Sequence, residues 1–132
     1  MNPTVRFILA VLAGVFAGGA VVAGIEALGH WIYHVPATHD PSAICEYLET
    51  APVMALVFPL IAWTLGAFIA GLIAKLVYRT NNKPAFVAGA IQLLFILINF
   101  FLILCHPIWM EVLGAIIPVP MAMLGSRLIA SR

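Results

Sequence analysis

Four long apolar stretches divide the chain, separated by short polar segments. They cover residues 5–28, 52–78, 84–105 and 107–130. The hydrocarbon core of a bilayer takes about 20 residues of helix, which each stretch provides. None of them alternates with a period of two, so membrane strands are disfavoured, and helices satisfy their own backbone groups in lipid. The pattern predicts an all-α fold: one four-transmembrane-helix bundle comprising residues 1–132.

The connections between the stretches predict how the helices are arranged. The turn at residues 79–83 is short, and the link before the fourth stretch is essentially His106-Pro107. Short links favour antiparallel neighbours in a helix bundle. The long connection, residues 29–51, contains its own helix start, with Asp40 as N-cap and Pro41 at the first position. We expect a short amphipathic helix at about 41–50, lying on the outer membrane surface.

Composition supports a membrane protein and excludes several other classes. Apolar residue types form 64% of the 132 residues, charged types only 8%, and the mean hydropathy is +1.14. A soluble domain carries about a quarter charged residues, so an ordinary soluble enzyme and a disordered chain are excluded. The net charge of +1 gives no basic surface for a nucleic acid.

The few charged residues are segregated along the chain. All basic residues fall at one end of the predicted bundle: Arg6, Lys75, Arg79, Lys83, Arg127 and Arg132. All acids and histidines fall toward the other end. By the positive-inside rule, both termini are expected in the cytoplasm. The first stretch is longer than the apolar region of a signal peptide, so we interpret it as a retained span.

Small residues recur at four-residue steps in two of the spans. Gly14 and Gly18 mark the first span, and Gly66 and Ala70 the second. Small residues let membrane helices approach closely. The pattern favours packing of these two spans against each other, and a homo-oligomer interface is the alternative.

Polar and ionisable side chains gather toward the outer end. Gln92, Asn99 and His106 follow one another at seven-residue steps, which places them on one slowly drifting stripe of the third span. Gln92 and Asn99 are expected to make structural hydrogen bonds between helices.

Four ionisable residues form the candidate site: Glu26, His30, His106 and Glu111. Glu26 and His30 are one helical turn apart, and the other two flank the last short link. Structural ion pairs and hydrogen bonds are the commoner explanation of such a cluster. The alternatives are a proton site, a divalent metal held by histidine and carboxylate, or contact with lipid or substrate. No pattern predicts a catalytic residue.

The two cysteines also fall on the outer side. Cys45 lies in the predicted surface helix and Cys105 at the end of the third span. On an oxidising face they would form a disulfide that ties the loop to the bundle, and two free buried thiols are the alternative.

Several motifs resemble a family of small bacterial four-helix integral membrane proteins. They are residues 25–30 (IEALGH), Asp40-Pro41, residues 62–67 (AWTLGA) and residues 106–109 (HPIW). The resemblance covers nearly the whole chain and implies a multi-pass protein of the bacterial inner membrane. It implies no activity, because none is assigned to that family.

Three functional hypotheses follow from these patterns. The first is a non-enzymatic membrane protein whose Glu/His cluster binds a cation or proton, with an oligomeric transport role. The second is an accessory or scaffold subunit of a larger membrane complex. The third is a metal-dependent enzyme that modifies lipids or quinones. The non-enzymatic hypotheses are favoured, with membrane lipids as partners and no nucleic acid.

Overall fold

The protein is entirely helical, as the hydropathy pattern predicts. A computed structural model describes all 132 residues and contains six helical segments. They are α1 (Pro3–Tyr33), α2 (Pro41–Thr50), α3 (Val53–Val77), α4 (Lys83–Leu102), α5 (Ile108–Ile116) and α6 (Pro118–Arg127). Only Ile117 separates α5 from α6, so the two form one apolar segment, Ile108–Arg127. With α1, α3 and α4, this gives four helices that are long and apolar enough to cross a membrane.

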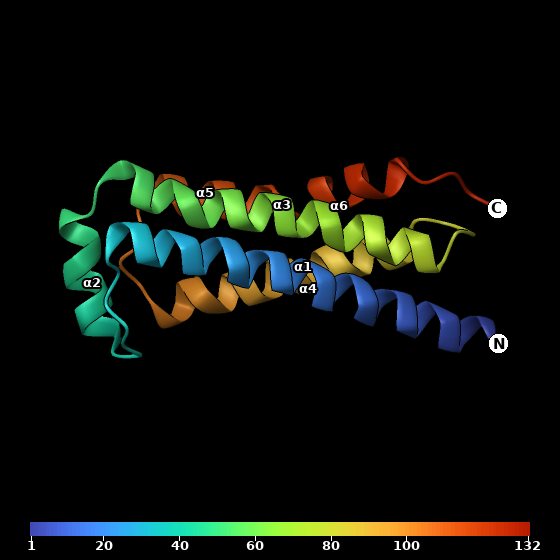
Figure 1. Ribbon diagram of the computed structural model, residues 1–132, viewed down its shortest axis with the longest axis horizontal. Coiled ribbons are helices and arrows are strands. Elements are labelled where there is room, and N and C mark those ends of the chain that lie inside the picture. The colour runs from blue at the N-terminus through green and yellow to red at the C-terminus, as the bar shows by residue number, and fades with distance from the viewer.

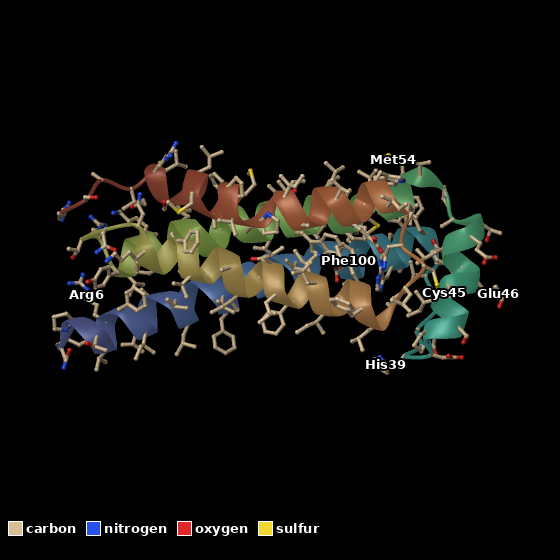
Figure 2. All side chains as sticks on the ribbon, turned by 180° about the vertical axis from the view of Figure 1, so that it is seen from behind. Arg6, His39, Cys45, Glu46, Met54 and Phe100 are labelled. Carbon is tan, nitrogen blue, oxygen red and sulfur yellow. A yellow bond between two sulfur atoms is a disulfide. The ribbon has the colours of Figure 1, made fainter.

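The four long helices lie side by side, and the two ends of the bundle differ in charge. Figure 1 shows both termini at one end and α2 lying across the other. In Figure 2, Arg6 marks the first end, and His39 and Glu46 mark the second. We call these the basic end and the loop end. At the basic end, the Arg6 side chain donates from Nε to the Val77 carbonyl, 2.9 Å away, which joins the start of α1 to the last residue of α3.

Helix α3 forms the centre of the bundle and packs against all the other long helices. Its buried face is made largely of small residues, among them Ala62, Ala67, Ala70 and Ala74, each with no exposed surface. Side chains of this size let backbones approach, which is how helices associate in lipid. Gly71 accordingly lies directly against the Ala122 backbone of α6.

Several helix boundaries differ from the sequence-based prediction. Helix α1 continues to Tyr33 instead of ending at residue 28, because nothing interrupts it before His34, which adopts a left-handed conformation (φ 52°). Helix α4 ends at Leu102, three residues before the expected end, and the link to α5 is correspondingly longer than His106-Pro107. Helix α6 ends at Arg127 and not at residue 130.

The prolines inside the spans have different effects. Pro59 lies within α3, which continues through it as one helix. Pro118 begins α6, and the helical pattern is interrupted just before it at Ile117. Proline at the first helical position lacks an amide that would be unpaired there anyway, so it suits a restart better than a helix interior.

Candidate functional site

Helix α2 forms a roof over the loop end of the bundle. Asp40 caps it by accepting from the Ser42 amide, 3.1 Å away, and Pro41 occupies its first position. Its apolar face is turned toward the bundle, whereas Glu46 and Glu49 are exposed. The helix therefore covers the ends of other helices with its apolar face.

Two interactions fasten this roof. Cys45 of α2 and Cys105, which follows α4, are joined by a disulfide across 60 residues of sequence, and the sulfur of the labelled Cys45 is visible in Figure 2. The Tyr47 hydroxyl donates to the Tyr33 carbonyl at the end of α1, 2.9 Å away. Burial raises the pKa of the Tyr47 phenol, and the neighbouring Tyr33 acts in the same direction. The phenol therefore stays neutral and able to donate at physiological pH.

A cavity of about 240 Å³ lies beneath α2. Its polar lining comes from five parts of the chain: Glu26, His30, Thr38, Tyr47, Asn99 and His106. Aromatic walls are added by Phe58 and Trp63 of α3, and no lysine or arginine lines it. We call this space the loop-end cavity. Its one carboxylate therefore has no permanent cation beside it.

Glu26 is held by a tryptophan. The indole Nε1 of Trp63 donates to Oε1 of Glu26, 2.9 Å away. Trp63 is only 6% exposed, and its ring packs edge-on against Phe100 with centroids 5.5 Å apart. The hydrogen-bond partner of Glu26 is therefore an indole from another helix, and not His30 one turn along α1.

The second carboxylate oxygen of Glu26 is free. Oε2 has no hydrogen bond within the protein, and every side-chain N or O atom that is fully buried has a partner. Oε2 is therefore accessible, and Glu26 is one of the residues that line the loop-end cavity. The same reasoning applies to the side-chain amide of Asn99, which has no protein partner and lines this cavity too.

His106 is oriented by the backbone. Its Nδ1 lies 2.7 Å from the Ile103 carbonyl, and its ring packs edge-on against Phe100 at 5.0 Å. Because a carbonyl only accepts, the proton lies on Nδ1, and Nε2 of the neutral ring is left as an acceptor. The acceptor, Ile103, directly follows α4, where the last carbonyls of a helix have no partner within the helix.

Glu111 is not among the residues that line the loop-end cavity. It lies in the first turn of α5 and is half-buried, whereas its neighbour Met110 is 2% exposed and lines the cavity. Successive residues of a helix point about 100° apart, so the two side chains take different directions. Nowhere do three or more His, Cys, Asp or Glu side chains meet in a group that could hold a metal ion.

Gln92 and Asn99, the other members of the predicted stripe, have different roles. Gln92 donates from Nε2 to the Trp63 carbonyl, 3.2 Å away, and is 8% exposed. This is a structural bond between α4 and α3. Asn99 faces open space two turns further along.

A second hollow of about 920 Å³ runs between α1 and α4. Its walls are mostly apolar, and two of its residues, Phe16 and Phe95, are 75% and 61% exposed. The hollow therefore reaches the apolar outer surface of the bundle, and we call it the α1–α4 groove. Glu26, Trp63 and Asn99 line both the groove and the loop-end cavity.

Two features of the sequence bear on this site beyond its ionisable residues. A tryptophan within an apolar span has an N–H that needs an acceptor when it is buried, and Glu26 is the only acid in any span before α5. Gly19, Ala20 and Ala23 lie off the Gly14–Gly18 stripe, and a small residue without a packing partner leaves space. The bond between Trp63 and Glu26 and the space beside Gly19 both depend on the distances between helices, which only the structure reveals.

No protein-family model matches the chain, and no curated protein or solved structure is significantly similar to it. The function is therefore argued from the geometry of the cavity and the groove.

Proposed function

We propose that this protein is a small, non-enzymatic, multi-pass protein of the bacterial inner membrane that binds a proton or a small cation at Glu26. The observation that carries the proposal is the state of this carboxylate. One oxygen is anchored by Trp63, and the other has no partner in the protein, on a residue that lines a roofed cavity without a fixed positive charge. Both termini would lie in the cytoplasm, with the loop-end cavity on the opposite side, as the basic residues favour.

An ionised carboxylate within a membrane span destabilises the protein, and a bound proton or cation would offset this destabilisation. Ionisable groups within membrane spans are expensive, so they mark ion and proton pathways by default. Glu26 lies seven residues before the end of α1, about 10 Å along the helix. A proton or a cation at Oε2 would neutralise the charge there.

The walls of the cavity suit an organic cation better than a coordinated metal. Phe58 and Trp63 present aromatic surfaces, which attract cations through the ring quadrupole. Asn99 adds a free amide, whereas the donor set for a metal is not assembled. A carboxylate that accepts either a proton or a cation exchanges one for the other, which is the elementary step of coupled transport.

The test is a binding titration with tetramethylammonium. In a Trp31→Phe, Trp109→Phe background, Trp63 is the single tryptophan and reports on the atoms beside Glu26. We expect saturable binding that Glu26→Gln abolishes. Glutamine keeps an oxygen for the Trp63 donor, so the fold and the probe are retained.

Glu111→Gln is the matched control, because it removes the same charge near the same end but outside the cavity. Binding should also weaken as the pH falls, since protons compete for Glu26. The other titratable groups lining the cavity are His30, Tyr47 and His106, and protonated histidines would act in the same direction. Unchanged binding in Glu26→Gln, or equal loss in both glutamine variants, would reject the proposal.

A further inference from the structure

We infer that the ligand of Glu26 is a single-chain amphiphile with one positively charged nitrogen head, whose hydrocarbon chain lies in the α1–α4 groove. This rests on the proposed function, because the same carboxylate binds the head. It adds the class of ligand and the direction from which the ligand arrives, which is sideways from the lipid.

The residues that the two hollows share carry the inference. The groove runs along α1 from Leu12 to Glu26, about 21 Å of helix, which exceeds half the roughly 30 Å hydrocarbon core. At its far end, Glu26 and Asn99 are shared with the loop-end cavity. An apolar chain in the groove would thus bring a charged head to the carboxylate that borders both hollows.

The groove is hollow because of the residues on α1 that face it. A Cβ atom built at Gly19 would meet nothing within 4 Å, and Ala20 and Ala23 are the other small residues of the wall. On the opposite side, Ile91 and Phe95 of α4 supply apolar surface. Side chains of ordinary size on α1 would fill this space.

Charge selects the head group. Neither hollow is lined by lysine or arginine, and Glu26 is the only acidic residue in either lining. A phosphate beside it would be repelled and left without a cationic partner, which excludes phospholipids as the occupant. An alkylammonium head would instead pair with Oε2.

The test compares two probes that share a head and differ in the chain: tetramethylammonium and dodecyltrimethylammonium. Protein with Trp63 as its single tryptophan is placed in phosphatidylcholine nanodiscs. We expect the dodecyl probe to bind at least about tenfold more tightly. Gly19→Leu should reduce its affinity by about tenfold or more and leave tetramethylammonium within about twofold.

Gly24→Leu is the matched control. A Cβ at Gly24 also meets nothing within 4 Å, but Gly24 lines neither hollow, so both affinities should stay unchanged. Dodecylphosphocholine, which adds a phosphate to the same head and chain, should not bind.

The outcomes separate the two proposals. If Gly19→Leu changes neither probe, or weakens both equally, the groove does not hold the chain, while loss of both probes in Glu26→Gln still supports the cation site. Equal binding of dodecylphosphocholine would overturn the selection by charge. If Glu26→Gln binds both probes normally, the proposed function and this inference both fail.

Discussion

Helix α1 meets its two neighbours in opposite ways. Against α3 the contact is tight: a Cβ at Gly14 would lie 2.5 Å from the Ala70 carbonyl oxygen, and one at Gly18 would lie 2.5 Å from that of Gly66. We call this contact the α1–α3 seam. Against α4, the same helix leaves the α1–α4 groove, where Gly19 faces open space.

The difference shows that a small residue in a membrane helix does not by itself mark a packing site. Gly18 and Gly19 are neighbours in sequence but point about 100° apart. What faces each of them decides whether the missing side chain permits close approach or leaves a hollow. The seam is a contact between two helices of the same chain, so Gly14 and Gly18 are covered and offer no surface to a second copy. An oligomer would need another interface.

The largest expected effect distinguishes the seam from the groove directly. Gly18→Leu forces a side chain into the Gly66 backbone and should destabilise the protein by about 3 kcal/mol or more. Gly19→Leu should change stability by less than about 0.5 kcal/mol, because the side chain enters open space. Unfolding by denaturing detergent, followed by circular dichroism, measures both. Equal losses of stability in the two variants would mean that α1 packs equally closely on both sides.

Trp63 stands where the seam, the groove and the loop-end cavity meet. Trp63→Phe removes the only donor to Glu26 and should cost about 2 kcal/mol, the size of a hydrogen bond to a charged group. The same unfolding assay measures the loss. The double variant Trp63→Phe, Glu26→Leu should recover part of it, because the unpaired carboxylate is then gone. No recovery would indicate that Trp63 acts only by packing against Phe100.

The disulfide holds the roof and touches neither side of α1. Chain entropy for a closed loop of this length gives a few kcal/mol in water, but inserted helices already restrict the unfolded chain, so we expect about 1 kcal/mol. Reductant should lower the thermal stability of the wild-type protein by the corresponding amount. Cys45→Ser, Cys105→Ser should start from the lowered value and not respond to reductant. A response in this variant would show that reductant acts elsewhere.

The smallest effect is expected at Gln92, which borders both the seam and the groove. Gln92→Leu removes the bond to the Trp63 carbonyl and should cost about 0.6 kcal/mol, the average for interhelical bonds in lipid. The unfolding assay used for Gly18 and Gly19 measures this loss of stability. Leu93→Ile, on the same helix, is the control variant with which Gln92→Leu is compared. A loss above about 2 kcal/mol would mean that Gln92 also sets the width of the groove.

The sequence alone predicted the fold to the level of its helices. Backbone groups in lipid must be satisfied within the helix, so apolar length is nearly sufficient to find a span. The start of α2 at Pro41 was equally local, since Asp40 and Pro41 satisfy the first turn by themselves. The helix ends were predicted less accurately. Helix α1 ends at His34 in a left-handed conformation, and a histidine does not mark such a position in the sequence as clearly as a glycine would.

The candidate site was only partly predictable. Glu26, His30 and His106 of the candidate site do line one cavity, and the pattern found them because scarce ionisable residues in an apolar chain are conspicuous. Asn99, which was expected to make a structural hydrogen bond, lines the same cavity. Glu111 does not line it, because one residue of helical rotation decides which space a side chain reaches. The partnership of Glu26 with Trp63, and the space on one side of α1 only, depend on distances between helices far apart in sequence. Periodicity determines which residues share a face of a helix, whereas packing alone determines what that face meets.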